Sequence, residues 1–170
     1  YKGALDNWPG RQTQAAFDIY RETVLKSTRV LAGDGTWGWT ARIVGENIVI
    51  DNASASWFGG DNDPIDNGLT ASGVATKGNP QLLGVSLPMD GFPKVRTCLG
   101  SPIPKLPWKT QVTVSKGDVS VTAPLLDIGP SKWAGDQVDL TQAAFQKFAP
   151  LKTGIIRGVT IIIHGGAHYV

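Results

Sequence analysis

The chain has 170 residues, of which 41% are hydrophobic and 18% charged, and its formal net charge is +2. This composition excludes a disordered polyelectrolyte, and a small net charge without any basic run excludes a typical nucleic-acid-binding face. The 21 glycines and 11 prolines argue against long helices and favour short strands joined by many turns. The length suits one compact domain with an appendage.

Several sites and signals are absent from the sequence. Cys98 is the only cysteine, which excludes an internal disulfide, and no Cys/His spacing matches a zinc site. No stretch approaches the roughly 18 apolar residues of a transmembrane helix. The start of the chain lacks the basic and apolar regions of a signal peptide. We therefore expect no metal, no cofactor and no membrane span.

The first part of the chain predicts one helix and then two strands. Apolar side chains recur at helical spacing over residues 10–27. Residues 37–43 then alternate, and residues 47–50 form a short apolar run, which together predict two strands joined by a turn at residues 44–47. Residues 59–110 show little periodicity and predict a long loop region, and loops of this length are usually functional.

The last third of the chain is regular again. Its patterns predict a hairpin of two strands, a short helix and a largely buried final strand, over residues 110–114, 119–123, 140–148 and 158–163. Residues 124–126 are a possible continuation of the second strand. Thr141 has the position and chemistry of a helix N-cap, and Pro150 follows the helix end.

Asp127 and Asp139 are the candidate catalytic residues. Asp127 ends an apolar strand, and Asp139 stands between Val138 and Leu140. Carboxyl groups with apolar neighbours are partly desolvated, which raises the pKa toward the value that a general acid needs near neutral pH. The alternative is that Asp139 caps the following helix and that Asp127 satisfies a turn.

Polar residues of the loop region are candidates for substrate binding. Asp63 and Asp66 belong to an acidic segment over residues 61–68, whose spacing fails to match a calcium loop because Ile65 and Pro64 interrupt it. One wall of a polar cleft is then a reasonable role for it. Thr70 and Ser72 lie in a small-residue turn that can approach a ligand closely.

Tryptophans supply the remaining candidates. Trp57, Trp108 and Trp133 lie in or beside the loop-rich part of the chain. Exposed tryptophan next to carboxylates suits a glycan cleft, because sugars present apolar faces that stack on aromatic rings. Burial in the core is the alternative for each of them, since tryptophan is highly buried on average.

Six segments occur in a recognisable order: ASWFG at 55–59, LTASG at 69–73, LPWKTQVTV at 106–114, LDIGP at 126–130, VDLTQAAF at 138–145 and the strand at 154–163. This series resembles the motifs of the RlpA-like double-psi β-barrel proteins over about residues 53–163. The resemblance implies a mainly β fold: a six-stranded double-psi β-barrel with short helices over residues 51–170. A helix-and-strand extension over residues 1–50 would precede it.

The same resemblance implies a function. Lytic members of the family cleave the MurNAc–GlcNAc glycosidic bond, and the aspartate of their D-L-S/T motif, here Asp139, is taken as the catalytic acid/base. Asp127 would line the same cleft. The implied partner is peptidoglycan or a related glycan, and the implied location is extracytoplasmic and bacterial: periplasm, cell envelope or secreted.

Two positions depart from the family pattern. Val74 stands where many members carry glutamate, and no histidine occurs between Gly73 and Leu106. The sequence therefore predicts a lytic transglycosylase-like enzyme and leaves two alternatives open. These are a non-catalytic barrel that binds peptidoglycan or another polysaccharide, and a structural component of a larger assembly.

Overall fold

The computed structural model describes residues 28–170, so the helix expected over residues 10–27 lies outside the described residues. The described part contains eight strands: β1 (Val30–Leu31), β2 (Ala41–Val44), β3 (Asn47–Phe58), β4 (Val85–Leu87), β5 (Gln111–Lys116), β6 (Val119–Ile128), β7 (Val138–Thr141) and β8 (Ile156–Ile163). Helical segments are short: α2 (Gln142–Phe145), η1 (Arg96–Cys98), η2 (Leu151–Thr153) and η3 (Gly166–Tyr169).

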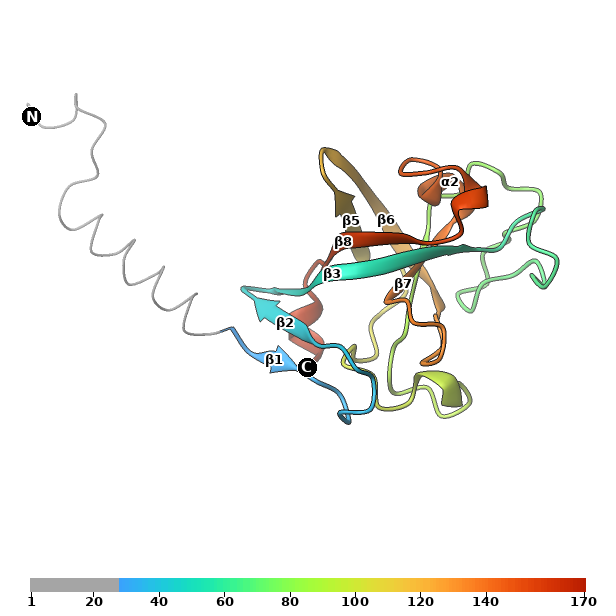
Figure 1. Cartoon of the computed structure of the whole chain (residues 1–170). Coiled ribbons are helices and arrows are strands. Elements are labelled where there is room, and N and C mark those ends of the chain that lie inside the picture. The colour runs from blue at the N-terminus through green and yellow to red at the C-terminus, as the bar shows by residue number, and fades with distance from the viewer. Residues whose placement is uncertain (1–27) are drawn as a thin grey trace, which may run out of the picture.

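Six of these strands form a closed barrel. The strand order is β1-β2-β3-β7-β4-β6-β5-β8, and β3 also pairs with β8, which closes the circle. Figure 1 shows β3 and β8 running side by side along the barrel. The mainly β, six-stranded barrel expected from the sequence is confirmed.

Two connections cross over a neighbouring strand. The chain passes from β3 to β4 across β7, which lies between them and is parallel to β3. It later passes from β6 to β7 across β4, which is parallel to β6. These interlocked crossovers give the barrel the double-psi topology expected from the motif resemblance, and they make β4 and β7 antiparallel neighbours in the barrel wall.

Alternating side chains of the barrel strands fill one hydrophobic core. In β8, Val159, Ile161 and Ile163 are fully buried, whereas Thr160 and Ile162 between them are half-buried. The final strand is therefore buried on one face only, because a closed barrel has one interior face and one exterior face. Phe145 of α2 is also fully buried and belongs to this core.

The predicted strands are present and most are longer than expected, but the first begins only at Ala41, so residues 37–40 are not part of it. The segment predicted as a long loop, residues 59–110, contains the short strand β4. The hairpin turn is reduced to Gly117 and Asp118, and β6 continues through residues 124–126 as suggested. The predicted helix over residues 140–148 is wrong in its first part. Residues up to Thr141 belong to β7, because they pair with β3 and β4, and α2 has only four residues.

The N-terminal strands extend the barrel rather than enter it. β1 pairs with β2, and β2 pairs with the first part of β3. Trp37 is buried, and its indole N–H donates to the Leu99 carbonyl at 3.0 Å, which attaches this segment to the η1 loop. The division at residue 50 lies inside β3, and the domain boundary stays a prediction. Within residues 28–170, no helix has the length and hydrophobicity needed to cross a membrane.

We expect Phe145→Ala to lower the free energy of unfolding by about 3–5 kcal/mol, because it leaves a cavity beneath α2. Trp133→Ala removes a larger side chain that is 78% exposed, so its effect should stay within about 0.5 kcal/mol. Urea unfolding followed by circular dichroism measures both variants. Equal effects would contradict the assignment of Phe145 to the core.

Candidate functional site

A row of four polar residues crosses four neighbouring strands. Ser56 of β3 pairs with Asp139 of β7, Asp139 pairs with Ser86 of β4, and Ser86 pairs with Asp127 of β6. Paired residues on adjacent strands point to the same face of a sheet. We call these four residues the polar row. The α-carbons of its two aspartates are two strand spacings apart, or roughly 10 Å.

An irregularity in β6 places Asp127 in this row. Val85 pairs with Leu125, but the next residue of β4, Ser86, pairs with Asp127, so β6 advances by two residues where β4 advances by one. Such a bulge changes the face to which the following side chain points. Leu125 lies in the core and is fully buried. Without the bulge, Asp127 would point into the core as well.

Asp139 is partly exposed and crowded by protein atoms. The Ser56 hydroxyl donates a short hydrogen bond to its Oδ1. Burial raises the pKa of Asp139 to about 7, the charges of Asp136 and Asp127 act in the same direction, and the Ser56 bond opposes them. A carboxyl group with this pKa is substantially protonated near neutral pH and can serve as a general acid.

Asp127 has a different environment. Its Oδ1 accepts the backbone N–H groups of Ala71 at 3.0 Å and Ile128 at 2.8 Å. Burial raises the pKa of Asp127, these two bonds lower it, and the charge of Asp66 raises it. The turn-satisfying role considered for Asp127 is thus present in the structure. The capping role considered for Asp139 is not, because Thr141 occupies the N-cap of α2.

An open hollow of about 460 Å³ lies beside Asp127. Its walls include Asp63, Asp66 and Thr70, three of the residues predicted to bind substrate, and Ile65 and Leu69 form an exposed apolar part of its lining. Asp139 is not among the lining residues. The hollow therefore brings three of the loop candidates together with Asp127, whereas Asp139 lies two strands away on the polar row, with Ser86 between them.

The two loop aspartates also hold the loop together. Asp63 accepts the N–H groups of Gly59 and Ile65. Asp66 accepts bonds from Thr76, Gly60 and Gly68. Burial alone would raise the pKa of Asp66, but the bonds from Thr76, Gly68 and Gly60 outweigh it and lower the pKa. Asp66 thus stays ionised, in contrast to Asp139.

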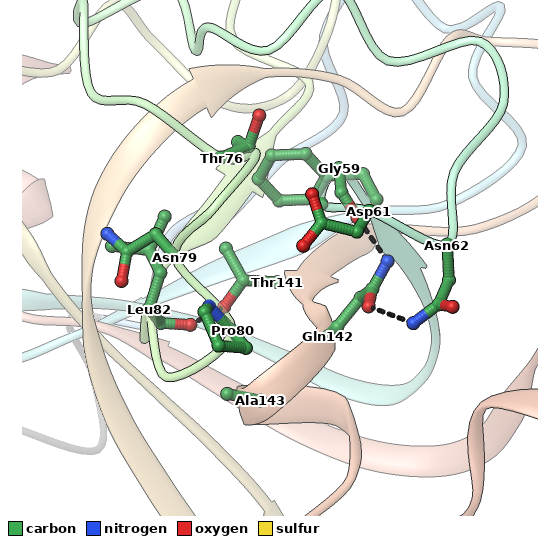
Figure 2. Close-up of a pocket in the computed structure, with 12 residues that line it drawn as sticks. Gly59, Asp61, Asn62, Thr76, Asn79, Pro80, Leu82, Thr141, Gln142 and Ala143 are labelled. Atoms are coloured by element: carbon green, nitrogen blue, oxygen red, sulfur yellow. Dashed lines mark hydrogen bonds between the residues drawn. The ribbon is translucent and has the colours of Figure 1, made fainter.

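A second, small cavity of about 50 Å³ lies between the same loop and α2. Figure 2 shows Gln142 between Gly59 and Asn62, bonded to both through its side-chain amide. Thr141 does not cap α2 with its side chain. It donates to the Leu82 carbonyl instead and accepts the Gly84 N–H at 3.0 Å. These contacts fix the loop against the end of β7.

The candidate tryptophans do not gather in the hollow. Trp57 is half-buried, packs against the core, and donates its indole N–H to the Leu151 carbonyl at 2.9 Å. Trp108 lies 6.0 Å from Phe92, centroid to centroid, and also packs on the core. Trp133 is 78% exposed in the connection between β6 and β7. Of the three, Trp133 has the exposure that stacking on a sugar requires.

Three serines lie close to the aspartates without lining the hollow, and sequence reasoning predicted only one of them, Ser72, as a site residue. Ser72 shares a hydrogen bond of 2.9 Å with Thr70, and its N–H donates to the Leu126 carbonyl. Ser56 and Ser86 were not predicted as site residues. The alternation in residues 53–57 could have placed Ser56 on a polar face, but nothing local to Ser86 reveals that it lies between two aspartates.

The fold and this site define the class: a closed six-stranded β-barrel with carboxyl and hydroxyl groups in a row on one face. Within residues 28–170, no group of three or more His, Cys, Asp or Glu side chains is arranged to hold a metal ion.

Comparison with known proteins adds one structural likeness. No family model matches the chain, and no curated protein matches it significantly. Among solved structures it is similar to the Streptomyces papain inhibitor (SPI), with a TM-score of 0.46 and 23% sequence identity. The match covers 71% of this chain and 96% of the inhibitor. No functional conclusion follows from a likeness at this level.

The raised pKa of Asp139 predicts a pH-dependent stability. Between its ordinary value of 3.8 and about 7, the folded state holds this proton more tightly than the unfolded state, so stability falls as the pH rises through that window. Asp139→Asn cannot titrate. We therefore expect it to gain up to roughly 4 kcal/mol relative to the wild type between about pH 4 and pH 8.

Urea unfolding of both proteins at several pH values measures this difference. Asp127→Asn should shift in the same direction, because burial also raises the pKa of Asp127. A constant difference between wild type and Asp139→Asn across the range would show that Asp139 titrates normally.

Proposed function

We propose that the protein is a lytic transglycosylase-like enzyme that acts outside the cytoplasm on peptidoglycan and cleaves the MurNAc–GlcNAc bond. The observation that supports this best is Asp139: a carboxyl group with a raised pKa that shares one face with Asp127, which itself lines an open hollow. The sequence motifs around both aspartates resemble those of lytic barrel proteins.

The proposed reaction needs one acid and no external nucleophile. Protonated Asp139 donates its proton to the glycosidic oxygen as the bond from C1 to that oxygen breaks. The C6 hydroxyl of the same MurNAc residue attacks C1 and gives its proton to the carboxylate of Asp139. The products are a 1,6-anhydro sugar end and a free hydroxyl on the leaving sugar, and Asp139 recovers its proton.

Asp127 and the hollow are proposed to hold the glycan. Both hydrogen bonds that the structure gives to the Asp127 carboxyl use Oδ1, so Oδ2 can accept a sugar hydroxyl. Asn67 and Thr70 add polar groups to the hollow, while Ile65 and Leu69 offer apolar contact to a sugar face. If Asp127 instead activated a water, the reaction would be that of an inverting hydrolase. The carboxyl groups of Asp127 and Asp139 would then need to lie about 6.5–9.5 Å apart.

A glycan-binding barrel without turnover is the second candidate. Two observations favour it: Asp139 does not line the hollow, and Val74 replaces the glutamate that many related barrels carry. This candidate needs the hollow and Asp127 but not the proton of Asp139. The two proposals therefore differ in what a substitution of Asp139 should do.

For the enzyme, Asp139→Asn should reduce the release of anhydro-muropeptides from intact sacculi by about 10²–10⁴-fold. The wild-type rate should fall above about pH 7, where Asp139 loses its proton. Asp118→Asn, in the exposed turn between β5 and β6, is the matched control and should release products at the wild-type rate. Mass spectrometry of the soluble fraction measures all three proteins.

Retention on insoluble peptidoglycan separates the two candidates. Binding by wild type and by Asp139→Asn with no product from either supports the binding barrel and rejects the enzyme. If Asp139→Asn released product at the same rate as the wild type, Asp139 would be rejected as the acid. Neither retention nor product would reject both functions.

A further inference from the structure

Ser86 lies between the two aspartates of the polar row, yet its hydroxyl bonds to neither of them. It pairs in register with Asp139 on one side and Asp127 on the other, and it is only 3% exposed. Its hydroxyl instead donates to the Gly129 carbonyl at 3.1 Å. The buried Ser86 hydroxyl therefore lies between two carboxyl groups but binds a backbone carbonyl, and this choice of partner calls for a structural explanation.

Gly129, which accepts this bond, lies close to the carboxyl group of Asp139. A Cβ atom built on Gly129 would be 3.7 Å from Asp139 Oδ2 and 3.2 Å from Ser86 Oγ. The φ angle of Gly129 is +155°, a conformation that suits glycine. The turn that follows β6 therefore lies close to Oδ2 of Asp139, whereas Ser56 bonds Oδ1.

We propose that Ser86 is a positioning residue that holds the Gly129 turn over Asp139 and thereby keeps water away from its carboxyl group. The inference rests on the role proposed above for Asp139. One backbone bond, from the Gly129 N–H to the Leu87 carbonyl at 3.0 Å, supports the same turn. The Cys98 thiol also donates to the Pro130 carbonyl at 3.6 Å. The Ser86 bond is the one that holds the Gly129 carbonyl itself and fixes its direction.

Other groups near Asp139 act independently of this attachment. Ser56 faces it from β3, Asp127 from β6, and Asp136 from the segment before β7. The Cys98 thiol of the η1 loop is also close enough for the charge of Asp139 to raise its pKa, in addition to the larger effect of burial. Substitution of Ser86 leaves all four of these groups in place. A change in the titration of Asp139 would therefore report on hydration.

The test is a ¹³C NMR titration of the Asp139 carboxyl in the full chain, without glycan. Loosening of the turn admits water, and hydration favours the charged form, so Ser86→Ala should lower the pKa of Asp139 by at least about one unit. Ser86→Cys keeps nearly the same size with a much weaker donor and should lower it as well. Ser54→Ala, a buried serine of β3 that does not bond to Asp139, should leave the titration unchanged.

An unchanged midpoint in Ser86→Ala overturns the inference. A midpoint in Ser86→Cys that stays at the wild-type value, together with a lowered midpoint in Ser86→Ala, also overturns it, because packing volume would then be responsible. If Ser86→Ala fails to fold, Ser86→Cys alone decides between these outcomes. The titration needs no substrate, so a lowered pKa supports Ser86 even where sacculi release no product, and that second result rejects only the proposed function.

Discussion

The candidate site depends on the register of one short strand. β4 has three residues and pairs with β7 on one edge and with β6 on the other. Its central residue, Ser86, therefore sets which residues of both neighbours share its face. The bulge in β6 makes this arrangement possible, because it turns the Asp127 side chain from the barrel interior to the face that carries Asp139.

Hydrogen bonding and burial then give the aspartates different protonation states. Asp66 receives bonds from one hydroxyl and two backbone N–H groups, and these outweigh its burial. Asp139 receives one hydroxyl bond in a more crowded place, and burial prevails. A carboxylate that accepts several donors stays charged, whereas a desolvated one keeps its proton. Asp66 and Asp139 therefore differ in protonation state near neutral pH.

Local patterns were enough to predict most of the strands. Alternation gave the hairpin of β5 and β6, and the apolar run at the end of the chain gave β8. The helix expected over residues 140–148 was too long, because Thr141 and Gln142 look like a cap and a first turn. In the structure the Thr141 hydroxyl bonds instead to Leu82 and Gly84 in the loop between β3 and β4, and both residues lie more than fifty positions earlier in the chain. Propensity carries no information about such partners.

The sequence by itself predicted a chain of strands and turns and singled out Asp127 and Asp139, because alternation and apolar flanks are local properties of the chain. The expectation of a six-stranded barrel came from the resemblance of its motifs to a known family. The tertiary structure alone decided that the two aspartates share a face with Ser56 and Ser86, and that Trp57 and Trp108 pack on the core instead of lining the hollow. Strand register, bulges and the closeness of the Gly129 turn depend on pairing between distant segments. The free energy of such pairing comes from the closed barrel as a whole, so no single segment encodes it.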